Sequence, residues 1–192
     1  MICEKYNCIF IHVPKTGGSS IEHVLDPNVK LDAESLIGRI LGNTAVVDKH
    51  AKAKKYAGSN KFKFGFVRNP WDWVVSVYKF YKILGQYNED FKCFLENMLP
   101  GIDDQYSYLE GVDFVGRFEN LQDDFDKVCD KIGMPRTKLP HTNTTKYIKK
   151  SGGGWELDNK HYTEYYDEMT KDIIAKVFKR DIEYFGYKFG ES

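Results

Sequence analysis

The chain has 192 residues, of which 42% are hydrophobic and 29% charged, and its 28 Lys and Arg balance its 28 Asp and Glu. This length suits one globular domain with a single core, so we expect one domain over residues 1–192. The zero net charge argues against general nucleic-acid binding, and no apolar run is long enough to form a transmembrane segment.

Two further features concern compartment and metal binding. The first residues, MICEKYN, lack the apolar core of a signal peptide, so we expect a cytoplasmic protein. The four cysteines are scattered, and no histidine lies at metal-ligand spacing from them. We therefore expect reduced thiols and no metal site.

The first predicted element is a buried parallel strand at residues 7–13 (NCIFIHV), followed by the turn PKTGGSS and a helix over residues 17–25. A second strand at residues 62–67 ends at Arg68. Asn69 and Pro70 then predict an N-cap and a first helical position for an amphipathic helix that runs to about residue 84.

The rest of the chain continues this alternation. We expect a helix at residues 90–98, a strand at 112–115, a helix at 119–132, a long loop at 135–154 and a terminal helix at about 163–184. Strands that alternate with helices predict an α/β fold, with a mainly parallel β-sheet flanked by helices. Ligands bind such sheets at the carboxyl ends of the strands, where both Lys15 and Arg68 fall.

The turn PKTGGSS is suited to holding an anion. Glycines allow close approach of the backbone, and the amides at a helix N-terminus attract negative charge. Lys15 adds a positive charge, and Ser19 and Ser20 add hydroxyl donors. The order GxxxxGK[ST] of nucleotide triphosphatases is absent, because here the lysine precedes the glycines. A glycine turn that serves only strand-to-helix packing stays open as the alternative.

The second strand end, 66-FVRNPWDWVVSVY-78, repeats this chemistry. Ser76 follows Arg68 by eight residues, and an arginine fork with a hydroxyl beside it suits a second phosphate group. A surface ion pair for Arg68 and a backbone-bonded hydroxyl for Ser76 are the structural alternatives. We expect Trp71 and Trp73 to be packing residues, and His12 to be a packed, hydrogen-bonded histidine.

The charges are segregated along the chain. Residues 49–68 hold seven Lys or Arg and no acid, and residues 131–155 hold six and no acid. Residues 86–126, by contrast, hold eleven Asp or Glu and only two basic residues. The basic stretches either gather around a compact anionic ligand or form solvated faces.

The two motifs together resemble the cofactor motifs of the sulfotransferases that use 3'-phosphoadenosine 5'-phosphosulfate (PAPS). The likeness is closest to the carbohydrate branch related to heparan sulfate 2-O-sulfotransferase. The stretches 112-VDFVGRFENLQDDF-125, 139-LPHTNTT-145 and 181-DIEYFGY-187 also resemble family segments, so the likeness covers nearly the whole chain. The resemblance implies the P-loop-like sulfotransferase fold and transfer of a sulfuryl group to a hydroxyl, leaving adenosine 3',5'-bisphosphate (PAP) as product.

The resemblance also assigns roles by position. Lys15 matches the lysine that holds the 5'-phosphosulfate and stabilises charge on the leaving phosphate, and Arg68 and Ser76 match the pair that binds the 3'-phosphate. His50 is the candidate base, because related members carry a histidine-alanine pair in this region; a surface histidine is the alternative. The residues that match the cradle around the 5'-phosphosulfate are Thr16, Gly17, Gly18, Ser19 and Ser20.

Family members of this kind in eukaryotes are usually membrane-anchored, whereas we expect no membrane anchor here. The acceptor implied is a hydroxyl-bearing molecule, with a carbohydrate as the first choice. Two rival functions stay open: a nucleotide-dependent kinase, and a non-catalytic nucleotide- or anion-binding module. The sequence does not indicate an oligomeric state.

Overall fold

The structure is a computed structural model that describes residues 1–28, 51–140, 147–149 and 155–191. The chain divides into two compact units, and each is built from two separate stretches of sequence. The first unit comprises Met1–Arg68 and Gln105–Thr142, and the second comprises Asn69–Asp104 and Asn143–Ser192. The expected single domain over the whole chain therefore stays a prediction.

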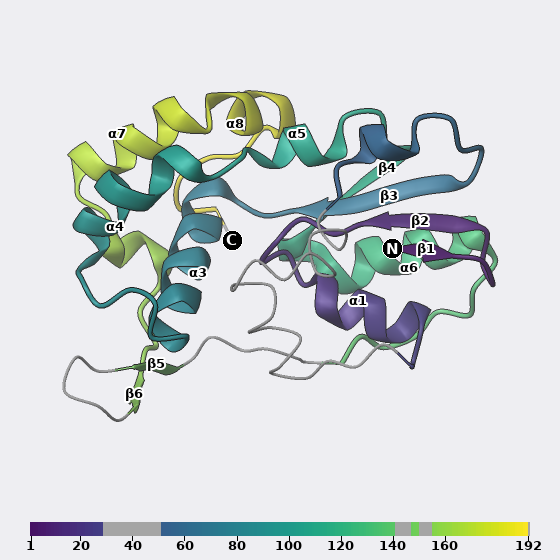
Figure 1. The fold of residues 1–192 in the computed structure, drawn as a ribbon, viewed down its shortest axis with the longest axis horizontal. Helices are drawn as coiled ribbons and strands as arrows, with labels where there is room; N and C mark the ends of the chain where they lie inside the picture. Colours follow the sequence, from purple (N-terminus) through teal and green to yellow (C-terminus); the bar gives the residue numbers. More distant parts are fainter. Residues whose placement is uncertain (29–50, 141–146, 150–154, 192) are drawn as a thin grey trace. The chain divides into compact units, whose positions relative to one another are not determined.

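The first unit is built on a four-stranded sheet in the order β1-β2-β3-β4 (Figure 1). Strands β2, β3 and β4 are parallel, with Phe10 opposite Phe64 and Phe64 opposite Phe114, whereas β1 is antiparallel to β2. This confirms the predicted α/β fold with a mainly parallel sheet. The strands are β1 (Ile2–Cys3), β2 (Cys8–Ile11), β3 (Phe62–Val67) and β4 (Phe114–Arg117).

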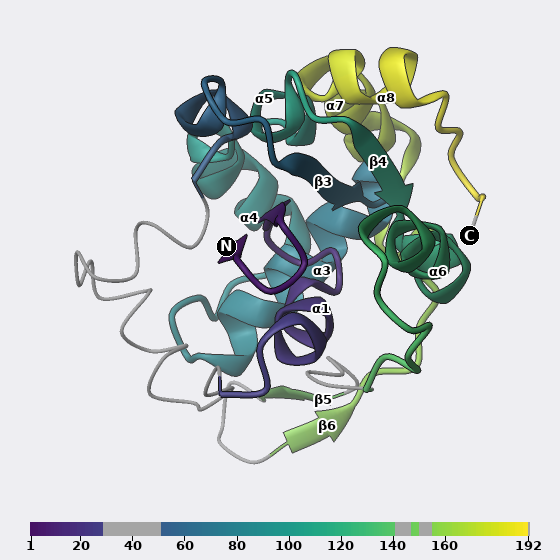
Figure 2. The same ribbon diagram turned by 90° about the vertical axis from the view of Figure 1, so that its right-hand side faces the viewer.

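Helices cover both faces of this sheet. Helices α1 (Gly18–Leu25) and α6 (Leu121–Ile132) lie on one side of the strands and α5 (Gln105–Leu109) on the other (Figures 1 and 2). Side chains of β2 and β3 pack against the first pair of helices in one buried cluster, which includes Phe10, Phe64, Phe66, Ile21, Leu25, Phe125 and Val128. Successive side chains of a strand alternate between faces, so Gly65 faces α5, where a Cβ would lie 2.3 Å from Leu109.

The second unit is mainly helical. Its core holds the fully buried side chains of Trp73, Phe94, Ile174 and Phe178. As predicted, Asn69 caps α3, and its side chain accepts a hydrogen bond from the Trp71 amide at 3.2 Å. The elements of this unit are α3 (Pro70–Ile83), α4 (Phe91–Met98), α7 (Glu168–Val177), α8 (Lys179–Phe185) and the antiparallel pair β5 (Tyr147–Lys149) and β6 (Trp155–Leu157).

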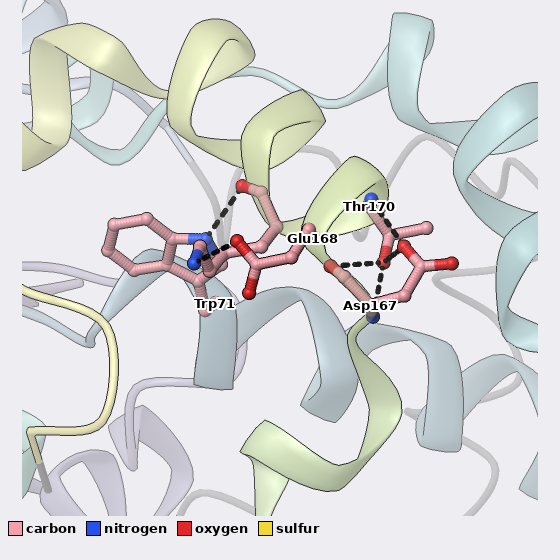
Figure 3. A network of polar contacts seen from close by, with 5 residues as sticks. Trp71, Asp167, Glu168 and Thr170 are labelled. Atoms are coloured by element: carbon pink, nitrogen blue, oxygen red, sulfur yellow. Dashed lines mark hydrogen bonds and ion pairs between the residues drawn. The ribbon is translucent and has the colours of Figure 1, made fainter.

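Trp71 joins α3 to the start of α7 (Figure 3). Its indole nitrogen donates a hydrogen bond to the Lys171 carbonyl at 3.0 Å. Nearby, Asp167 caps α7 by accepting from the Thr170 amide at 2.7 Å, and the Asp167 amide donates to the Thr170 hydroxyl at 2.9 Å. Trp71 and Trp73 are thus buried packing residues, as the sequence predicted.

The structure differs from the predicted elements in several places. The short elements β1 and α5 were not predicted, and β5 lies inside the stretch expected to be a long loop. The predicted terminal helix at about 163–184 begins only at Glu168, after a 3₁₀ turn at Tyr162–Tyr165. It is also broken at Phe178, which has φ −102° and ψ 29° between α7 and α8. Phe178 is 1% exposed and its ring packs edge-on against Trp73, with ring centroids 5.4 Å apart, so the break accompanies burial of this ring in the core.

Across the ranges that the structure describes, no helix is long and apolar enough to cross a membrane. The cytoplasmic location remains a prediction.

Candidate functional site

The turn between β2 and α1 has the backbone that an anion cradle needs. Gly17 adopts a left-handed conformation with φ 80°, and Lys15 does so with φ 64°, which is rare for a residue with a side chain. The Thr16 hydroxyl donates to the Val13 carbonyl at 2.9 Å, so this side chain closes the turn. Because Gly17 has no side chain, it gives the first amides of α1 no side-chain cap. Those amides are suited to an anionic ligand.

Neither glycine of the turn has room for a side chain. A Cβ on Gly18 would lie 2.4 Å from atoms of the His12 ring, and one on Gly17 would lie 2.7 Å from a Leu121 methyl group. His12 is 4% exposed and Glu22 is 2% exposed, and His12 Nδ1 lies 2.8 Å from Glu22 Oε1. His12 is therefore the packed, hydrogen-bonded histidine that the sequence predicted. This contact joins the residue that follows β2 to helix α1 across the turn.

The structure brings Arg68 to the same turn. Arg68 follows β3, the parallel neighbour of β2, and its Nη1 donates a hydrogen bond to the Lys15 carbonyl at 3.3 Å. The guanidinium carbon lies 4.2 Å from the centroid of the Phe118 ring, within the range of a cation–π contact. Two of the predicted cationic residues therefore lie together at the carboxyl end of the sheet.

This arrangement changes the acidity of the lysine. Burial, and then the positive charge of Arg68, lower the pKa of Lys15 from 10.5 to about 8. Two neighbouring cations favour a ligand that carries negative charge, because the ligand offsets their mutual repulsion.

Other predicted residues are not placed at this turn by the structure. Ser76 is a buried residue of α3 in the second unit, 3% exposed, and its pairing with Arg68 stays a prediction from their spacing. His50, the candidate base, lies outside the described residues. The same holds for residues 144–146 and 150–154 of the predicted long loop.

The sequence did not single out two side chains that hold Arg68. Phe118 stacks on its guanidinium, and the Gln105 side chain is hydrogen-bonded to its backbone. Phe118 directly follows β4, the third parallel strand, so it is marked by a strand end as Lys15 and Arg68 are. Gln105 lies in a short helix that no periodic pattern indicates, and nothing in the sequence marks it.

A glycine turn and two cations at adjacent carboxyl ends of a parallel sheet define an α/β protein whose strand edge is suited to an anionic ligand. The family model described as Sulfotransferase family matches residues 1–188, and the chain belongs to this family. A protein of Archaeoglobus fulgidus, described as an uncharacterized protein, is 38% identical over 90 residues, which cover 42% of this chain and 75% of that protein. No solved structure matches the chain.

Proposed function

We propose that this sulfotransferase-family protein transfers a sulfuryl group from PAPS to a hydroxyl group of a carbohydrate. The observation that carries the proposal is the meeting of Lys15 and Arg68 at an uncapped, glycine-rich helix start. A donor with phosphate groups at two ends suits two cations that belong to two different strand ends.

In this proposal the PKTGGSS turn and the stretch at residues 66–78 bind the two ends of the donor. Lys15 and the turn through Ser20 hold the 5'-phosphosulfate, and Thr16 contributes its backbone because its hydroxyl is bonded to Val13. Arg68 holds the 3'-phosphate, together with Ser76, whose part rests on the eight-residue spacing of the motif. When bound, PAPS supplies the activated sulfuryl group.

The chemistry asked of the protein is charge stabilisation and proton removal. Lys15 stabilises the negative charge that develops on the leaving phosphate oxygen, and this role does not require a metal ion. His50 accepts the proton of the attacking hydroxyl, since histidine titrates near neutral pH. The carbohydrate acceptor rests on the resemblance to the heparan sulfate 2-O-sulfotransferase branch.

The experiment is a calorimetric titration with PAP, AMP, and ATP with magnesium. We expect PAP to bind tightest, and R68A to weaken PAP by about tenfold or more, the loss typical of a charged hydrogen-bond partner. Arg136 provides the matched control, because it forms an exposed ion pair with Asp130 at 2.7 Å, and R136A should leave the affinity unchanged.

Other results would favour the rival functions. Tightest binding of ATP with magnesium would indicate a kinase. PAP binding without sulfuryl transfer from PAPS to any carbohydrate acceptor would indicate a binding module. For an enzyme, K15A should lower turnover far more than it lowers PAP affinity.

A further inference from the structure

Gln105 makes an unusual pair of contacts with the residue at the end of β3. Its side chain is 0% exposed. Its amide nitrogen donates to the Arg68 carbonyl at 2.8 Å, and the Arg68 amide donates to its side-chain oxygen at 2.8 Å. Only one orientation of the side-chain amide satisfies both hydrogen bonds, so donor and acceptor are fixed by the contacts themselves.

These two hydrogen bonds pair both backbone polar groups of the residue that follows β3. The ladder between β3 and β4 ends where Val67 lies opposite Arg117. One residue further on, the Gln105 amide offers Arg68 one donor and one acceptor, as a neighbouring strand would. Arg68 thus keeps a defined backbone conformation beyond the end of the strand.

The fixed backbone determines where the Arg68 side chain begins. From that point the guanidinium reaches the Lys15 carbonyl at 3.3 Å and stacks on Phe118 at 4.2 Å. A long flexible side chain loses entropy when it binds a ligand, and a site that is already ordered reduces this loss. A residue that fixes the backbone of Arg68 therefore contributes to any anion affinity that Arg68 provides.

The position of Gln105 along the chain supports this role. The chain leaves the first unit after Arg68 and returns to it at Gln105. The side-chain amide therefore ties together the two ends between which residues 69–104 are inserted. Displacement of either end would shift the backbone that carries the guanidinium.

We propose that Gln105 is a positioning residue for recognition of the 3'-phosphate by Arg68. This inference rests on the proposed function, in which Arg68 binds that phosphate. The alternative is a purely structural role, in which Gln105 only satisfies buried backbone groups.

The test compares PAP with AMP, which lacks the 3'-phosphate, by calorimetry on Q105L and on the unmodified protein. We expect Q105L to weaken PAP by about tenfold, a loss of about 1.4 kcal/mol, and to change AMP affinity by less than about twofold. A purely structural role would lower the thermal midpoint and leave the ratio of the two affinities unchanged.

Gln122 provides a matched control. Its side-chain amide also bonds to backbone, donating to the Thr137 carbonyl at 3.1 Å and accepting from the Leu139 amide at 2.9 Å. Q122L should therefore lower stability without altering the ratio of PAP to AMP affinity. A Q105L protein that keeps the unmodified ratio would overturn the inference.

A second variant tests the hydrogen bonds themselves and serves if Q105L does not fold. In Q105E the ionised carboxylate accepts from the Arg68 amide but has no donor for the Arg68 carbonyl, whereas the protonated acid restores both contacts. PAP affinity of Q105E, relative to the unmodified protein at the same pH, should recover as the pH falls. A relative affinity that is independent of pH would contradict the inference. If the unmodified protein itself shows no preference for PAP over AMP, the proposed function fails and this inference fails with it.

Discussion

Lys15 combines a strained backbone with a perturbed amine. A left-handed conformation costs a residue with a side chain about 1 kcal/mol or more, and Lys15 adopts it with φ 64°. Burial next to Arg68 adds an electrostatic cost, since it lowers the pKa of the amine to about 8. Strain and charge repulsion at one residue are typical of a site whose geometry serves a ligand.

The lowered pKa predicts opposite pH trends for stability and for binding. Between about pH 8 and 10.5 the unfolded chain keeps a proton on Lys15 that the folded protein has lost, so this residue's contribution to stability should rise with pH. PAP affinity should fall over the same range, because the ammonium group is lost. Thermal midpoints and calorimetric titrations across this range measure both trends.

The variant K15M is the control for this prediction. It has no amine, so the difference between the unmodified protein and K15M isolates the titration of Lys15 from that of tyrosines and cysteines in the same range. Equal pH profiles for the two proteins would show that Lys15 does not titrate between about pH 8 and 10.5, and would contradict the prediction.

For single residues, the sequence predicted the positions of the charged groups better than it predicted the residues that contact them. Lys15, Gly17 and Arg68 are marked by strand ends and by turn chemistry, which are local patterns. Gln105 acts on Arg68 from 37 positions away, and its contacts exist only after the sheet has formed. Gly18 was expected to admit a ligand, and the structure adds a packing reason in the His12 ring beneath it.

At the scale of elements, a buried ion pair ties helix α3 to the residue that follows β6. Lys79 Nζ lies 3.3 Å from Asp158 Oδ2, and the two side chains are 11% and 3% exposed. The Tyr165 hydroxyl donates to the same carboxylate. The ion pair thereby fixes the position of the residue that directly follows β6 relative to helix α3.

Removing one partner should therefore be costly. We expect K79M to lower the free energy of unfolding by about 3 kcal/mol, because it leaves a buried carboxylate without its cation. The double variant K79M/D158N should recover part of this loss, since the carboxylate charge is then absent. Urea unfolding at neutral pH measures both changes.

The exposed pair of Lys179 and Glu183 on α8 offers a comparison in the same unit. Its charged atoms are 3.6 Å apart, and its side chains are 70% and 66% exposed, so K179M should cost less than about 0.5 kcal/mol. A K79M protein as stable as K179M would show that the buried pair adds nothing.

Elements with strong periodic patterns were predicted closely, and short ones were not. The strand at residues 62–67 and the helix from Pro70 agree with the structure because a buried apolar run and an Asn-Pro start are local signals. Strand β1 has two residues and α5 has five, too few to show a period. Their positions depend on partners elsewhere in the chain.

At the scale of the whole molecule, the two units alternate along the chain. The chain passes from one unit to the other after Arg68, after Asp104 and after Thr142, so neither unit is a continuous stretch of sequence. Each unit can be completed only after the chain has passed through the other. We therefore predict that the two units unfold together, as one domain.

The placement of the tryptophans makes this prediction measurable. Trp71, Trp73 and Trp155 all belong to the second unit, whereas the parallel sheet belongs to the first. Tryptophan fluorescence therefore follows one unit, and far-ultraviolet circular dichroism follows both. For one cooperative domain the two signals should give the same urea midpoint and the same slope. Two separate midpoints would show that the units are independent domains. The substitution K79M then distinguishes the two cases again: in one domain it shifts both signals equally, whereas in independent domains it shifts the fluorescence transition and leaves the sheet's transition in place.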